Sequence, residues 1–568
     1  MKYFFFLFCF LIAFTSCQEN APETADLLLL NADVYTVNAQ QPRAEAVAVK
    51  DGKIIAVGSN ADLENLRGEN TEVTDLEGNF LMPGFIEGHG HFSGLGKSLL
   101  NLNFLKSENW EEIIAQVEKA AAAAKPGEWI EGRGWHQEKW THTPEENFRG
   151  YPYLYDLSAV SPDNPVILFH ASGHSLFANE AAVKAAGISA DTPSPAGGEI
   201  VRDFDGKIVG VFEERAMTGI RTAYQDYLET LSPAARLARW HESIKAAEKE
   251  CLTKGITSFQ DAGTLAYEVN RYRDMAEKGE LDLRLWSMLR HPYDTLKTLN
   301  ISDYQAVGAG DNFYTCNALK SEVDGALGAF GAWLLRPYND KPGFEGQNTT
   351  PIKDVEGIAD MALANDMQLC VHAIGDRANR ITLNIMEKAV RSRPDSADLR
   401  WRIEHAQHLD TTDIPRFRDL GIIASMQGIH CTSDAPFVEK RLGEERSRTG
   451  AYPWRSLLDA GVIIANGTDA PVEDVSPLES FYASVTRKRA DTGFEFYPEQ
   501  RMTRAEAIYS YTLGNAYAAF EEDLKGSLEA GKLADMVVLS KDLINCTDAE
   551  ILETEVLQVY VGGKLREY

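Results

Sequence analysis

The stretch FIEGHGH at residues 85–91 joins an apolar strand pattern to two histidines at its carboxyl end. In an extended strand, residues two apart point to the same side, so His89 and His91 are expected to form a pair of imidazoles suited to chelate a metal. Seven further apolar segments alternate with helix-compatible stretches, at 256–263, 283–289, 317–325, 368–376, 401–407, 422–427 and 462–470. Eight such units predict an α/β protein built on a (β/α)8 TIM barrel rather than on an open sheet.

Residues able to bind metal recur near the ends of these segments. His372 lies in the fifth strand, His405 in the sixth and Asp469 in the eighth, while Lys320 lies in the fourth. Because the carboxyl ends of all barrel strands open into one mouth, these residues are expected to converge. A single buried histidine more often only hydrogen-bonds within a core. Imidazoles and a carboxylate repeated at strand ends instead favour a site for zinc or another divalent ion.

The two ends of the chain are β-rich. Apolar runs occur at 27–37 and 46–58, the second of which contains the turn dipeptide Asp51-Gly52, and similar runs occur at 534–540 and 556–568. We therefore expect a small β-sandwich built from both chain ends, residues 27–80 and 525–568. The barrel is expected at 81–106 and 236–524, and an α+β segment at 107–235 is expected to be inserted over its mouth after the first barrel strand.

The N-terminus has the pattern of a targeting signal. Lys2 precedes an apolar run at 3–14, which is shorter than the roughly 20 residues that span a bilayer. The following Thr15-Ser16-Cys17 resembles a bacterial lipoprotein signal. We expect a signal peptide at 1–16, lipidation of Cys17 and a tether at 17–26, which would anchor an extracytoplasmic protein to a membrane, in the periplasm or at the cell surface. An ordinary secretory signal is the alternative.

Composition excludes several classes of protein. The 568 residues include 56 Lys and Arg against 85 Asp and Glu, a formal net charge of −29, so the chain lacks the basic face that nucleic acid requires. Its 7 cysteines are scattered without a CxxC pair, which argues against a disulfide framework and a thiolate zinc site. The sequence leaves open whether the protein is a homo-oligomer.

Six blocks resemble one known family. GFIEGHGH, ALKSEVDGALG, VHAIGDRAN, RIEHAQ, NGTDAPV and GSLEAGKLADMVVL occur in the order found in the amidohydrolase superfamily, in particular its N-substituted formamide deformylase-like branch (amidohydrolase family 3 type). The resemblance extends from about residue 27 to residue 568. It implies a distorted (β/α)8 barrel with a small β-sandwich, and hydrolysis at a centre of one or two metal ions.

The resemblance also implies roles for individual residues. His89 and His91 would bind the more buried metal, His372 and His405 the second, and Asp469 would reach the first metal and accept a proton. An ammonium group has no lone pair, so Lys320 would act as a carboxylated lysine that bridges two Zn²⁺ ions. Glu322 or Asp324 is the alternative bridge.

The expected activity is hydrolysis of a C–N bond in a small molecule, most simply an N-acyl or N-formyl amide. A metal-bound hydroxide would attack, and Asp469 would serve as general base and then acid. Deamination or cyclic-amide hydrolysis within the superfamily is one alternative, and a lipoprotein that binds a solute without catalysis is another. Further residues expected to contact substrate are His174, His136, His430 and Arg377, of which Arg377 is also suited to a structural ion pair.

Overall fold

The computed structural model describes residues 24–137, 140–170, 175–195, 198–392 and 398–567. At its centre eight parallel strands form a nearly closed ring, which confirms the predicted barrel. Their order is β24 (Ile464–Gly467), β23 (Ile423–Gln427), β22 (Arg402–His405), β21 (Gln368–Ala373), β20 (Tyr314–Glu322), β18 (Arg284–Leu289), β17 (Ile256–Thr264) and β8 (Phe85–Gly90). At the carboxyl ends of β8 and β24, Asp469 N–H donates to the His89 carbonyl and His91 N–H to the Ala470 carbonyl, each over 2.7 Å, which joins the first strand to the last.

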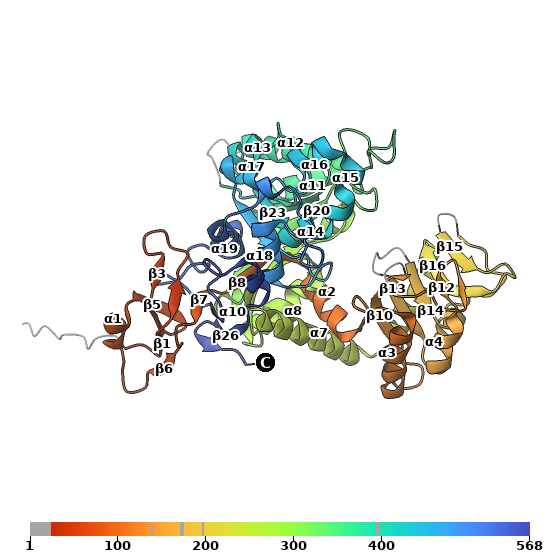
Figure 1. Ribbon diagram of the computed structural model, residues 1–568, viewed down its shortest axis with the longest axis horizontal. Helices are drawn as coiled ribbons and strands as arrows, with labels where there is room; N and C mark the ends of the chain where they lie inside the picture. Colours follow the sequence, from red (N-terminus) through yellow and green to blue (C-terminus); the bar gives the residue numbers. More distant parts are fainter. Residues whose placement is uncertain (1–23, 138–139, 171–174, 196–197, 393–397, 568) are drawn as a thin grey trace, which may run out of the picture.

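Helices follow the strands and surround the ring (Figure 1). Those of the barrel are α2 (Phe92–Leu100), α7 (Pro233–Thr253), α8 (Ala266–Glu277), α9 (Tyr293–Leu296), α10 (Ala309–Asn312), α11 (Ile352–Ala364), α12 (Asp376–Ser392), α13 (Ile414–Asp419), α14 (Gly428–Ser433), α15 (Ala435–Leu442), α16 (Glu444–Gly450), α17 (Trp454–Asp459), α18 (Pro477–Thr486), α19 (Arg504–Tyr511) and α20 (Leu513–Ala518). Short elements between them are η2 (Ile301–Tyr304), β19 (Ala306–Gly308) and η3 (Pro498–Gln500). Inside the ring, the buried guanidinium of Arg402 lies 5.4 Å from the buried Trp286 ring.

Two packed sheets form the sandwich: one comes from the N-terminal segment alone, and the other combines strands from both chain ends. One contains β1 (Leu27–Leu30), β4 (Ala46–Lys50), β5 (Lys53–Gly58) and β6 (Glu72–Asp75); the other contains β2 (Asp33–Tyr35), β3 (Arg43–Ala44), β7 (Phe80–Pro83), β25 (Met536–Leu539), β26 (Val556–Val561) and β27 (Lys564–Leu565). Antiparallel pairing of β7 with β25 joins the two ends of the chain. The hairpin predicted at Asp51-Gly52 is present, and both residues have the positive φ (49° and 74°) that its tight turn requires. Two short helices belong to the same segments of the chain: α1 (Asn60–Glu64) lies between β5 and β6, and α21 (Asp548–Leu552) lies between β25 and β26.

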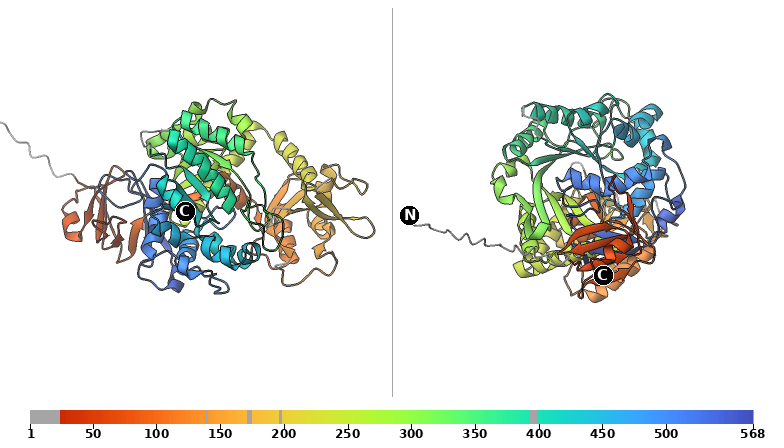
Figure 2. Two further views of the ribbon diagram at one scale, coloured as in Figure 1. Left: turned by 90° about the horizontal axis from the view of Figure 1, so that it is seen from above. Right: turned by 90° about the vertical axis from the view of Figure 1, so that its left-hand side faces the viewer.

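The inserted α+β segment lies between α2 and α7 in the sequence. Its mixed sheet has the order β15 (Gly198–Arg202), β16 (Ile208–Glu214), β14 (Ser175–Ala178), β13 (Val166–His170), β10 (Ile130–Trp135) and β9 (Leu102–Asn103). The helices α3 (Trp110–Ala123), α4 (Leu154–Val160), α5 (Glu180–Ala185) and α6 (Met217–Thr230) pack against it, and β11 (Asn147–Phe148) pairs with β12 (Tyr151–Pro152). Figure 2 shows this insertion and the sandwich at opposite ends of the molecule, with the barrel between them.

The predicted signal peptide and Cys17 lie outside the described residues. Within the described ranges, no helix combines the length and the apolar character needed to cross a bilayer. Of the cysteines there, Cys251, Cys316, Cys370 and Cys431 are buried and Cys546 is half-buried, all as free thiols.

Candidate metal centre

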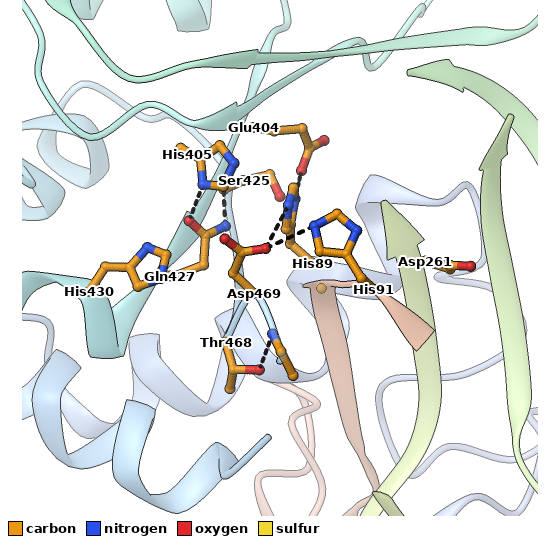
Figure 3. A network of polar contacts seen from close by, with 12 residues as sticks. His89, His91, Asp261, Glu404, His405, Ser425, Gln427, His430, Thr468 and Asp469 are labelled. Carbon is orange, nitrogen blue, oxygen red and sulfur yellow. Dashed lines mark hydrogen bonds and ion pairs between the residues drawn. The ribbon is translucent and has the colours of Figure 1, made fainter. Parts of the chain in front are cut away.

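The residues predicted to bind metal lie at or just beyond the carboxyl ends of the barrel strands. His89 is in β8 and His91 follows it, Lys320 is in β20, His372 in β21, His405 ends β22 and Asp469 follows β24. Asp469 Oδ1 lies 3.5 Å from His89 Nε2 and 3.2 Å from His91 Nε2 (Figure 3). The barrel thus gathers two imidazoles and a carboxylate from opposite ends of the sequence.

His405 extends this group toward His372. Its ring centroid lies 4.7 Å from that of His89 and 4.4 Å from that of His372. One ligand atom from each of His89, His405 and Asp469 lies within 4.8 Å of the others, which is close enough for the three to share one ion. The histidines and Asp469 therefore form one continuous cluster across the mouth of the barrel.

The atoms that face one another in this cluster suit a divalent cation. His89 Nε2, His372 Nε2 and Asp469 Oδ1 are buried and make no hydrogen bond to any described residue. Leaving such a polar atom unsatisfied costs about 1–3 kcal/mol, so three of them together indicate that these atoms serve a ligand. Imidazole nitrogen and carboxylate oxygen are ordinary zinc ligands, so the residues present fit the metal implied by the sequence.

Burial keeps these imidazoles neutral. Burial and the nearby Lys320 cation lower the pKa of His89 to about 4 and that of His372 to about 3. Burial and the neighbouring His372 hold the pKa of His405 well below its usual value. A neutral imidazole has the free lone pair that metal binding requires. Burial opposes ionisation of Asp469, but the adjacent histidines outweigh it and hold the pKa of this carboxyl well below its usual range.

A buried acid fixes the tautomer of His89. Nδ1 of His89 donates a hydrogen bond to Oε2 of Glu404. Because an ionised carboxylate only accepts, the proton stays on Nδ1 and the lone pair of Nε2 faces Asp469. Arg402 holds Glu404 in turn, through Nε to Oε1 over 2.8 Å and Nη2 to Oε2 over 3.1 Å. Burial opposes ionisation of Glu404, but Arg402 and His89 outweigh it and keep the pKa of Glu404 well below its usual value.

Two candidate ligands occupy unusual backbone conformations. The φ angle is 76° at His405 and 60° at Asp469, a region that residues with a Cβ seldom adopt. At His405 this conformation interrupts strand alternation, so the adjacent residues Glu404 and His405 both reach the His89 ring. Such strain costs about 1–3 kcal/mol and persists where the surrounding structure imposes it. Here it aims side chains into the mouth.

Glu87 connects the strand of His89 to the loop of Asp469. Its Oε1 accepts the Thr468 N–H over 2.7 Å, and its Oε2 accepts the Thr468 hydroxyl over 3.2 Å. Burial raises the pKa of Glu87 to about 8. A Cβ at Gly467 would lie 2.4 Å from Glu87 Oε1, so glycine is required directly before Thr468.

Lys320 lies at the wall of a cavity of about 510 Å³. Its side chain is buried, and burial lowers the pKa of its ammonium group. Glu322 lines the same cavity, but its carboxylate pairs with Arg290 over 2.5 Å. Asp324 accepts hydrogen bonds from three backbone N–H groups, those of Trp333, Ile374 and Gly375. Both alternatives for a bridging group are therefore engaged by protein donors.

The residues expected to contact substrate lie in different places. His430 is buried with its ring 6.3 Å from that of His405, and its Nδ1 bonds to Gln407 over 2.9 Å. His136 lies in the insertion, 4.5 Å from the His170 ring, and His174 lies outside the described residues.

Arg377 is held by the protein itself. Its Nη2 pairs with Glu345 over 2.7 Å, and its Nε donates to the Leu334 carbonyl over 2.9 Å. Its guanidinium also lies 5.5 Å from the Trp333 ring. These contacts correspond to the structural ion pair that the sequence left as the alternative for this residue.

Three residues of the centre were missed by sequence reasoning. Glu404 bonds to His89 and is itself held by Arg402, and Gln427 Oε1 lies 2.8 Å from Nδ1 of His405. The signal in the sequence that could have identified Arg402 and Glu404 is their charge, because both are charged residues within a strand that is predicted to be buried. At the rim, Arg133 of the insertion donates to the Pro471 carbonyl over 2.9 Å, which brings β10 against the loop after Asp469.

An eight-stranded parallel barrel with histidines and an aspartate at its carboxyl face defines the class of metal-dependent barrel hydrolases. The family model "Amidohydrolase family" matches residues 72–566, and the chain belongs to this family. The N-substituted formamide deformylase of Arthrobacter pascens is 31% identical over 566 residues, covering 95% of this chain and 98% of the relative. The putative amidohydrolase YtcJ of Bacillus subtilis is 31% identical over 544 residues, covering 94% of this chain and 97% of the relative.

Solved structures show the same architecture. An uncharacterized metal-dependent hydrolase from Pyrococcus furiosus is 25% identical and superposes with a TM-score of 0.74, covering 91% of this chain and 100% of the relative. An uncharacterized metal-dependent hydrolase from Pyrococcus horikoshii is 24% identical with a TM-score of 0.75, covering 92% of this chain and 99% of the relative. Each of these solved chains therefore aligns over most of this chain and shares its overall fold.

Proposed function

We propose that this amidohydrolase-family enzyme hydrolyses the C–N bond of a small amide at a centre of two divalent metal ions, most simply Zn²⁺. One observation carries the proposal: His89 Nε2 and His91 Nε2 both lie within 3.5 Å of Asp469 Oδ1, with no well-aligned hydrogen bond among the three atoms. His89, His91 and Asp469 would hold one ion, and His372 and His405 the other. When bound, such ions polarise a carbonyl group and acidify a water molecule.

Asp469 is the residue we assign to proton transfer. Its carboxyl group is ionised, so it can accept a proton from the attacking water and then give it to the departing amine. Glu404 and Gln427 hold the proton-bearing side of His89 and His405, which leaves the opposite nitrogens for the metals. The strained backbone at Asp469 fixes its carboxylate against His91.

Lys320 is the residue we assign to bridging, as a carbamate formed with carbon dioxide. Its lowered pKa favours the neutral amine that this reaction needs, and its side chain lies at the wall of the 510 Å³ cavity. That cavity also contains the Arg290–Glu322 pair and His291, and it is of a size that accepts a small molecule. We propose it as the place where the substrate lies.

The deformylase relative acts on N-substituted formamides, as its name states, which supports an amide as the bond that is cleaved. We therefore propose the bond type and leave the acyl group and amine open.

The deciding experiment pairs an activity screen with metal analysis. Purified protein would be tested on N-formyl and N-acyl amines, lactams and amino-heterocycles, beside Asp469→Asn and a surface control, Asp294→Asn. Hydrolysis of an amide that falls about a thousandfold or more in Asp469→Asn supports the proposal. Turnover of only amino-heterocycles or lactams would replace it with deamination or cyclic-amide hydrolysis. Metal binding without any turnover would make the protein a solute binder.

We also propose that the mature chain is a bacterial lipoprotein anchored through Cys17. The support lies in the sequence alone, in the short apolar run at 3–14 and the small residues before the cysteine.

A further inference from the structure

A second cavity lies between the insertion and the outer helices of the barrel. Its volume is about 490 Å³, and its walls come from α2, α6, α7 and α8. Of the residues that line it, only Lys97 also lines the cavity at Lys320. This cavity contains none of the candidate metal ligands, so it is distinct from the centre described above.

The charge of this cavity is unlike that of the whole chain. Four basic residues line it in a protein of net charge −29: Lys97, Arg236, Arg239 and Arg271. Among the described residues, none of the four has a carboxylate partner within 4.0 Å. The acid in the lining is Glu131, whose Oε2 accepts the Tyr224 hydroxyl over 2.7 Å. The cavity therefore presents cations that the protein itself leaves unneutralised.

Apolar groups gather at the same place. Trp240, Tyr224 and Leu228 line the cavity, together with Leu100 and Tyr267, which are 38% and 46% exposed. The guanidinium carbon of Arg271 lies 5.0 Å from the Trp240 ring and 4.9 Å from the Tyr267 ring, so two aromatic side chains hold its position. Exposed apolar side chains beside a fixed cation suit a ligand that is apolar at one end and anionic at the other.

We propose that this cavity binds a small organic carboxylate with an aliphatic or aromatic body. The carboxylate lies against Arg239 and Arg271, and the body lies against Trp240, Leu228 and Leu100. The volume falls within the roughly 300–1,000 Å³ of ordinary small-molecule sites. The site needs no metal, so it stands whether or not the proposed hydrolysis is correct.

The test is calorimetric titration with octanoate, 1-octanol and octyltrimethylammonium. Octanoate should bind with one site per chain, and the neutral and cationic analogues should bind about tenfold more weakly or not at all. Arg239→Gln/Arg271→Gln should weaken octanoate binding by about tenfold or more. The matched control is Arg221→Gln/Lys249→Gln, which removes two positive charges from α6 and α7 without touching the lining; it should bind octanoate like the unmodified protein.

A second arm separates this site from the metal centre. Protein treated with a chelator should bind octanoate as strongly as untreated protein, whereas a carboxylate held by metal ions would be released. If the double variant loses its circular dichroism signature, Arg239→Gln alone replaces it. The proposal is overturned by absent octanoate binding, by equal binding of the octyl cation, by unchanged binding in the arginine variant, or by loss of binding with the metal.

Discussion

Replacing Glu404 by glutamine tests whether His89 must be held in one tautomer. The amide matches the carboxylate in shape, but it can donate a hydrogen bond to Nδ1 of His89. The ring proton would then move to Nε2, the atom that lies 3.5 Å from Asp469 Oδ1. Loss of such an outer partner usually costs about 10–100-fold in metal affinity, or about 1.4–2.7 kcal/mol. We expect the upper part of this range because Arg402 also loses its buried counter-charge.

The assay is competition for zinc against a chromophoric chelator at neutral pH, with urea unfolding of the metal-free protein as a measure of stability. Glu248→Gln is the control, because Glu248 is equally buried and bonds to Lys245 and to the Asp282 N–H, away from the histidines. It should lose stability but keep zinc affinity within about threefold. A folded Glu404→Gln protein with unchanged zinc affinity would refute the role assigned to Glu404.

Three further outcomes are expected. Lys320→Ala should lose bound metal and recover part of it when a short carboxylic acid is added, as measured by elemental analysis; full metal content without the acid would point to Glu322 or Asp324 as the bridge. Glu87 has a folded pKa raised by burial to about 8, so its stabilisation is fully present below the ordinary value of 4.5 and is lost as the pH rises toward 8. Relative to Glu87→Gln, the metal-free protein should therefore lose roughly 1.4 kcal/mol of unfolding free energy per pH unit in this window, and urea curves with a constant difference would contradict this. Cys17→Ser should move the protein from the membrane fraction to the soluble extracytoplasmic fraction and remove the lipid mass; membrane association without lipid would exclude this anchor.

The barrel could be predicted because its strands are buried on both faces. Segments such as 256–263 and 422–427 are apolar runs between helix-compatible stretches, and the topology of a closed ring then places their carboxyl ends together. The structure brings His89, His91 and Asp469 together in the way this reasoning expects.

The support of the centre could not be predicted in the same way. Strand alternation places the adjacent Glu404 and His405 on opposite sides, and only the positive φ at His405 lets both reach His89. No local sequence pattern predicts a positive φ for a histidine. The second cavity, lined by α2, α6, α7 and α8, depends on how the insertion packs against the barrel. That packing is set by contacts between distant segments rather than by periodicity.

The most direct measurement is a crystal structure of the zinc-loaded protein with anomalous diffraction at the zinc edge. The proposed arrangement predicts one anomalous peak among His89, His91 and Asp469, and a second beside His372 and His405, with density for a carbamate on Lys320 between them. Zinc bound elsewhere, with these side chains hydrogen-bonded only to protein or water, would contradict it.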